Sequence, residues 1–81
     1  MRIKVLFFAA LREVFGERTR FVEIRDGASI HEVVQGLSHE SKDFVLNKIP
    51  LIFAVNGDFE SGERPLRDRD ELALMMPMSG G

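Results

Sequence analysis

The fold is decided by the stretch Ser29-Ile30-His31-Glu32-Val33-Val34-Gln35-Gly36-Leu37. A serine at a helix N-cap with a glutamate three positions later is a capping box, which satisfies the backbone donors of a first helical turn. The apolar residues behind it recur at the spacing of one helix face. The stretch therefore predicts an amphipathic helix over residues 30–38, with a buried stripe formed by Ile30, Val33, Val34 and Leu37.

Strand patterns lie on both sides of this helix. They alternate between polar and apolar residues or are rich in β-branched and aromatic residues, and they cover residues 3–9, 19–25, 51–55, 58–60 and 71–76. Asn56-Gly57 is a strong hairpin turn signal, and Pro77 lacks the N–H that a further strand residue would need. A short helix is expected over residues 9–15, and residues 41–47 could form another.

One long helix can cover only one face of a sheet. The first strand has apolar residues on both faces, with Ile3, Val5, Phe7 and Ala9 on one and Leu6 and Phe8 on the other. We therefore expect it to lie in the middle of the sheet, parallel to the last strand. This arrangement indicates an α+β protein of the β-grasp, or ubiquitin-like, type. It has a mixed sheet of four to five strands, one main helix and short helices, in a domain over residues 1–76 with a flexible tail over 77–81.

The composition argues against several functional classes. The formal net charge is −2, with 11 basic and 13 acidic residues interspersed, which provides no basic stripe for nucleic acid or a membrane surface. No apolar run approaches the roughly 20 residues of a membrane span, and the start does not resemble a signal peptide, so we expect a cytoplasmic protein. The absence of cysteine excludes thiol catalysis. His31 and His39 fall off the apolar stripe, and we expect them to be solvated rather than metal ligands.

The tail Pro77-Met78-Ser79-Gly80-Gly81 is the most informative segment for function. A terminal glycine pair is expected to be mobile, because glycine loses the most conformational entropy on ordering. Without Cβ atoms, these residues can enter a narrow channel and bring the carboxyl group of Gly81 to a partner's reactive centre. A chain of 81 residues has little room for a catalytic cleft beside its core, so a binding or carrier module is favoured over a self-contained enzyme.

Four blocks in this order and spacing resemble the small subunit of molybdopterin synthase, a ubiquitin-like sulfur carrier. They are Lys4-Val5-Leu6-Phe7-Phe8-Ala9-Ala10-Leu11-Arg12-Glu13, Ala54-Val55-Asn56, Asp70-Glu71-Leu72-Ala73 and Pro77-Met78-Ser79-Gly80-Gly81. This chain departs from the family pattern at Arg69-Asp70, where Gly-Asp is usual, and at Met76-Pro77-Met78, where Pro-Pro-Val is common.

The resemblance implies a mechanism that uses the tail. An adenylyltransferase related to ubiquitin-activating enzymes consumes ATP to adenylate the carboxylate of Gly81, and a sulfur donor protein converts it to a thiocarboxylate. The tail then enters the large subunit of molybdopterin synthase and donates its sulfur to the pterin precursor, which forms the dithiolene of molybdopterin. The resemblance further implies a heterotetramer with two copies of each subunit, and no cofactor bound by this chain itself.

The same resemblance places Phe8, Arg12, Phe59 and Met75 at the surface that contacts partners. Each also has a structural interpretation: Phe8, Phe59 and Met75 could belong to the core of a small domain, and Arg12 could be a solvated helix charge. Three other functions remain open. They are a sulfur carrier for thiamine synthesis, a protein modifier joined to target lysines through Gly81, and an interaction domain with an inert tail.

Overall fold

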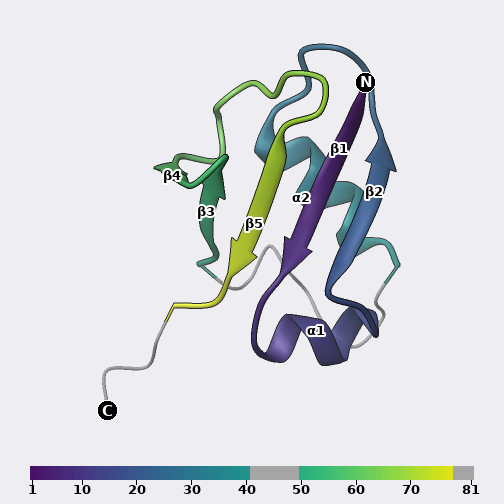
Figure 1. Ribbon diagram of the computed structural model, residues 1–81, viewed down its shortest axis with the longest axis vertical. Coiled ribbons are helices and arrows are strands. Elements are labelled where there is room, and N and C mark those ends of the chain that lie inside the picture. The colour runs from purple at the N-terminus through teal and green to yellow at the C-terminus, as the bar shows by residue number, and fades with distance from the viewer. Residues whose placement is uncertain (41–49, 78–81) are drawn as a thin grey trace.

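The computed structural model describes residues 1–40 and 50–77, so the possible helix over residues 41–47 lies outside the described part of the chain. Figure 1 shows a sheet with a helix behind it and a short helix beyond the end of the first strand. The elements follow in the order β1 (Arg2–Phe7), α1 (Ala10–Phe15), β2 (Thr19–Glu23), α2 (Ile30–Ser38), β3 (Ile52–Val55), β4 (Asp58–Glu60) and β5 (Glu71–Met75).

The strands form one five-stranded mixed sheet in the order β2-β1-β5-β3-β4. β1 and β5 run parallel, with Val5 opposite Leu72 and Phe7 opposite Leu74, and the other neighbouring strands are antiparallel. The predicted pairing of the first and last strands is confirmed, and with it the β-grasp fold. Neither helix in the described ranges is long and apolar enough to cross a membrane.

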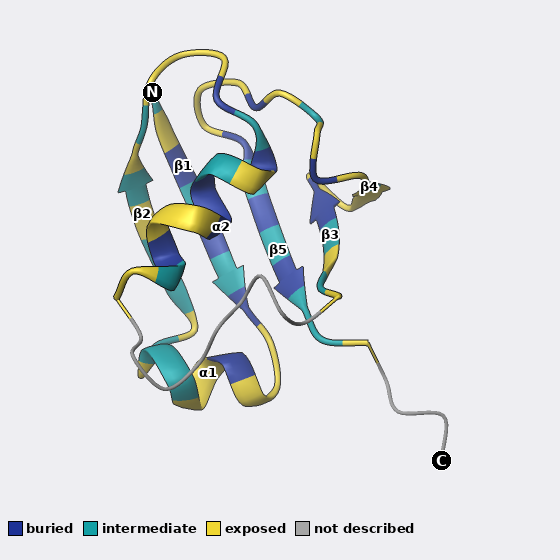
Figure 2. Ribbon diagram, turned by 180° about the vertical axis from the view of Figure 1, so that it is seen from behind, coloured by how far each residue is buried: buried dark blue, intermediate teal, exposed yellow. Residues whose placement is uncertain are grey.

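The helix α2 covers one face of this sheet (Figure 2). It starts as predicted, since the Ser29 hydroxyl accepts a hydrogen bond from the Glu32 N–H at 3.3 Å, while the Glu32 carboxylate accepts from the Arg25 guanidinium. The whole predicted stripe is buried against the strands. The core contains Ile3, Val5, Phe7, Leu11, Ile30, Val33, Val34, Leu37, Val55, Leu66, Leu72 and Leu74.

β1 is shorter than predicted because the chain turns at Ala9. This residue has φ 51° and ψ −129°, a conformation that residues with a Cβ rarely adopt and that costs about 1–3 kcal/mol. The strand therefore ends at Phe7, and Ala9 is exposed instead of lying on the core face. The turn is held by α1, which buries Leu11 completely and stacks Phe15 on Phe7 with ring centroids 4.5 Å apart.

The start of β5 is fixed by a buried carboxylate, Asp70. It accepts hydrogen bonds from the Arg67 N–H at 2.8 Å and from the Asn56 side-chain amide at 3.0 Å, and it pairs with Arg64 at 3.4 Å. Burial alone would raise the pKa of Asp70, but these hydrogen bonds and the Arg64 charge outweigh burial and lower it below the ordinary value. The preceding residue, Arg69, has φ 69°, in the left-handed region that favours glycine.

Candidate functional site

The face of the sheet away from α2 carries an apolar surface. Cross-strand partners point to the same face of a sheet. The register places Leu6 opposite Ala73, Ala73 opposite Ala54, and Ala54 opposite Phe59, in one row across four strands. Because Phe7 and Leu74 point into the core, these neighbours point outward. A second row pairs Met75 with Ile52.

We call this surface the apolar outer face and define it by Leu6, Phe8, Ile52, Phe59, Ala73 and Met75. Phe8 is included because it directly follows Phe7, the last residue of β1, and the pairing of Phe7 with Leu74 brings it to the end of the sheet where Met75 lies. The exposed fractions are 77% for Phe59, 38% for Ile52 and 36% for Phe8, whereas Leu6, Ala73 and Met75 are half-buried. An apolar surface that spans several strands typically marks a binding site.

A band of charged residues bounds the apolar outer face toward the start of β1. Lys4 pairs with Glu71 at 3.7 Å, and Arg2 lies 3.9 Å from Glu23. The exposed ring of Phe21 lies within this band, opposite Lys4 in the register of β1 and β2, with the Arg2 guanidinium carbon 4.5 Å from its centroid. The apolar outer face is therefore confined to the end of the sheet where β1 and β5 finish.

The predicted tail leaves the sheet at this same end. β5 finishes at Met75, Met76 packs against the core, and Pro77 is exposed (Figure 1). Met78, Ser79, Gly80 and Gly81 lie outside the described residues. The structure thus places Met75, the last residue of β5, within the apolar outer face.

The residues of this chain that are predicted to contact a partner lie in two different environments. Phe8, Phe59 and Met75 all belong to the apolar outer face. Arg12 is exposed in α1, but its Nε–H donates a hydrogen bond to the Phe7 carbonyl at 3.1 Å, and its guanidinium carbon lies 5.6 Å from the centroid of the Phe8 ring. Arg12 is therefore engaged within this chain rather than being only a solvated charge.

Sequence reasoning did not include Ile52 among the partner-contact residues, although it predicts a strand over residues 51–55. Strict alternation along this run would have found it. Phe53 and Val55 point inward, so Ile52 and Ala54 must point outward. A short apolar run does not show by itself which face has a covering element.

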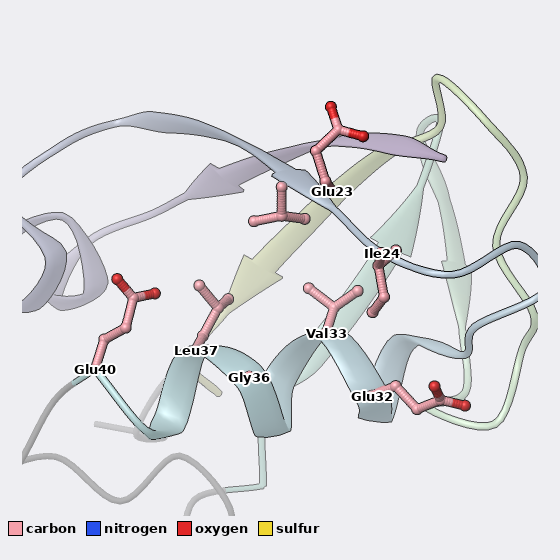
Figure 3. A pocket seen from close by; sticks show the side chains of 8 residues that line it. Glu23, Ile24, Glu32, Val33, Gly36, Leu37 and Glu40 are labelled. Carbon is pink, nitrogen blue, oxygen red and sulfur yellow. The ribbon is translucent and has the colours of Figure 1, made fainter.

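A groove of about 210 Å³ lies between β2 and α2 (Figure 3). Its apolar lining includes Val22, Ile24, Val33 and Leu37. The acidic side chains beside it are engaged in ion pairs, Glu32 with Arg25 and Glu40 with Arg20. In residues 1–40 and 50–77, His, Cys, Asp and Glu form no group of three or more that could hold a metal ion.

The fold defines a small ubiquitin-like domain, and one face of its sheet is the apolar outer face. Residues 5–81 match the ThiS family, and the chain belongs to this family. It is 35% identical over 85 residues to a protein of Chlamydomonas reinhardtii, with each chain covered in full, and 36% identical over 81 residues to a protein of Escherichia coli (strain K12), with 98% of this chain and 99% of the other covered. Both are called molybdopterin synthase sulfur carrier subunit.

Solved structures share the fold. The crystal structure of SAMP1 from Haloferax volcanii superposes with a TM-score of 0.84 at 25% identity, and both chains are covered in full. A chain in the complex of subunits 1 and 2 of the molybdopterin-converting factor from Helicobacter pylori superposes with a TM-score of 0.65 at 23% identity, also with full coverage.

Proposed function

We propose that this chain is the sulfur carrier subunit of a molybdopterin synthase. The observation that carries the proposal is the position of the apolar outer face: it includes Met75, the last residue of the strand that leads toward Gly81. A partner bound to this face would hold the end of β5 and would receive the tail next to its own contact surface. The full-length relatives that bear this name support molybdopterin synthesis over thiamine synthesis.

The proposed chemistry takes place at the C-terminal carboxyl group of Gly81. A terminal carboxyl has a pKa of about 3.3–3.7, so it is an anion at neutral pH and a poor acyl electrophile. Adenylation by a partner that uses ATP releases pyrophosphate and forms a mixed anhydride, and a sulfur nucleophile then displaces AMP to form the thiocarboxylate. The chain has no cysteine, so this terminal group is the place where it can carry transferable sulfur.

The proposed partners act in sequence in the cytoplasm. The adenylyltransferase and the sulfur donor load the tail, and the large subunit of the synthase then uses it, with its catalytic groups acting on the pterin precursor. The Helicobacter pylori structure is a complex of a subunit 1 and a subunit 2, which supports a large subunit as a partner of this chain. This chain would contribute the docking surface and the sulfur.

Deletion of Gly81 tests the proposal. It withdraws the carboxyl group by one residue, about 3.3–3.6 Å, and catalysis loses about 100-fold for a displacement of about 1 Å. We therefore expect no dithiolene product in a reaction reconstituted with the loading enzymes and the large subunit, and we expect an unchanged unfolding temperature. A chain extended by one residue after Gly81 should also be inactive, whereas Gly81→Ala should retain partial activity. Normal product formation by the shortened chain would contradict the carrier mechanism.

A second candidate function is protein modification through the same carboxyl group. The structural similarity at 25% identity to SAMP1, whose name stands for small archaeal modifier protein 1, supports this alternative. An adenylated C-terminus could also react with target lysines. The intact mass of the chain purified from its own cells separates the two functions. An exchange of one oxygen for one sulfur at the C-terminus supports the carrier, and covalent conjugates to other proteins support the modifier. An unmodified chain under all conditions would support the domain with an inert tail.

A further inference from the structure

Phe8 occupies an unusual place on the apolar outer face, because no strand holds it. It follows the last residue of β1 and precedes the strained turn at Ala9. Its exposed fraction is 36%, so part of the ring is open to solvent and part is covered by this chain. An aromatic anchor binds a partner more tightly when its rotamer is already fixed, since immobilising it on binding has an entropic cost.

The side chain of Arg12 contacts both of the residues that precede the turn at Ala9. Its Nε–H binds the Phe7 carbonyl at 3.1 Å, and its guanidinium carbon lies within the distance of a cation–π interaction from the Phe8 ring, at 5.6 Å. Arginine suits both contacts, because one edge of the planar guanidinium donates a hydrogen bond while its face lies over a ring.

The backbone under Arg12 is firmly placed. The Leu11 N–H binds the Phe8 carbonyl at 3.1 Å, and the Arg12 N–H binds the Ala9 carbonyl at 3.0 Å. The side chain of Leu11 is fully buried in the core. α1 therefore fixes the backbone position of Arg12, from which its side chain contacts the Phe8 ring.

We propose that Arg12 is a positioning residue for Phe8: it holds the ring in the orientation that the large subunit binds, and it contributes to partner binding through Phe8. The proposal rests on the proposed function, because it takes the large subunit as the partner. It assigns to Arg12 a role within the chain, in place of the direct partner contact that the sequence resemblance implies.

A double-mutant cycle tests this role. It compares the affinities of the chain and its variants for the purified large subunit. We expect Phe8→Ala to weaken binding about 30-fold, as for a central aromatic anchor. Arg12→Ala should weaken it about fivefold. In the Phe8→Ala background, Arg12→Ala should have no further effect. An undiminished fivefold loss in that background would show that Arg12 contacts the partner itself, and it would overturn the proposal.

Two further variants separate positioning from charge. Arg18 is exposed in the loop between α1 and β2, so Arg18→Ala removes the same charge and should change the affinity less than about twofold. Arg12→Lys keeps the charge but loses the planar fork, and it should weaken binding nearly as much as Arg12→Ala. Full affinity in Arg12→Lys would mean that charge alone is sufficient, which contradicts the proposal.

A measurement of the Phe8 rotamer in the free chain tests the positioning role of Arg12 without any partner. Side-chain couplings in NMR should show one dominant χ1 rotamer for Phe8 in the unaltered chain and averaging over several rotamers in Arg12→Ala. The same single rotamer in both proteins would overturn the inference even if the large subunit binds. Conversely, a fixed Phe8 in a chain that does not bind the large subunit would leave the positioning role standing and would refute the proposed function.

Discussion

The two faces of the sheet carry similar side chains but differ in what covers them. On the inner face, Val5, Leu72 and Leu74 are buried under α2, with exposed fractions of 0%. On the outer face, Leu6 and Met75 come from the same two strands but remain half-buried, and Phe59 is 77% exposed. The contrast shows that the same kind of apolar side chain becomes part of the core only where another element, here α2, covers its face of the sheet. The predictions below test the proposal that the inner face stabilises the fold and that the outer face binds a partner.

The largest effect is expected on the inner face. Val34→Asp places a charge on the buried stripe of α2 without a partner, and it should lower the free energy of unfolding by about 3 kcal/mol or more, which is a large part of the stability of such a domain. Thermal unfolding followed by circular dichroism measures this effect. Gln35→Asp is the matched control, since residue 35 is exposed in the same helix and should tolerate the charge. A stable, cooperatively folded Val34→Asp variant would show that the stripe does not support the core.

A charge on the outer face should act on binding instead. Among the described residues, Phe59→Asp alters the most exposed of the large apolar side chains, so its effect on the unfolding free energy should stay within about 0.5 kcal/mol. Its affinity for the large subunit should fall by about 2 kcal/mol, or about 30-fold, as for an aromatic anchor. Calorimetric titration measures the loss. Phe21→Asp is the control, because Phe21 lies opposite Lys4 within the charged band that bounds the apolar outer face, and an equal loss in both variants would contradict the assigned surface.

The buried carboxylate at the start of β5 predicts a dependence of stability on pH. The pKa of Asp70 is lower in the folded chain than in the unfolded chain, so the folded state binds fewer protons at acidic pH. Its contribution is therefore present above about pH 4 and is lost as the pH falls through the folded pKa. Asp70→Asn should cost about 2 kcal/mol at neutral pH, through weakened hydrogen bonds, and should reduce the slope of stability below about pH 4. Asp58→Asn, at an exposed position in β4, should leave the slope unchanged.

The smallest effect is expected at the turn before Asp70. Arg69→Gly removes a Cβ from a residue with φ 69°, and it should raise the free energy of unfolding by about 1 kcal/mol. Arg67→Gly removes an equal charge at a residue outside the left-handed region, and it should destabilise the chain slightly, because glycine adds conformational freedom to the unfolded state. Chemical denaturation compares the two variants. A loss of stability in Arg69→Gly would show that the arginine side chain stabilises this turn.

The sequence predicted those parts of the fold that local signals specify. The capping box and the apolar stripe lie within one short stretch, so α2 could be bounded correctly from residues 29–38. The parallel pairing of β1 and β5 followed from the apolar pattern on both faces of β1. Phe8 and Phe59 are exposed and Met75 is half-buried, and the predicted contact of these three residues with a partner stays a prediction.

Other features depend on contacts that sequence patterns do not show. The turn at Ala9 has no sequence signal, because alanine rarely adopts its conformation, so β1 was expected to extend past Phe7. The burial of Asp70 depends on Asn56, which is 14 positions away, whereas the charged run over residues 67–70 indicates only a solvated turn. The positioning contacts of Arg12 require the orientation of α1, which no periodicity specifies. The roles of Gly80 and Gly81 rest on chemistry and resemblance alone.

An NMR titration of the isotope-labelled chain with the unlabelled large subunit tests the central claim most directly. We predict that backbone signals of Leu6, Ala73 and Phe59 on the apolar outer face shift or broaden on binding, together with those of the tail. Signals of the exposed side of α2, such as Gln35 and Gly36, should stay in place. Changes centred on α2 and its groove, with the outer face unaffected, would contradict the assignment of the two faces.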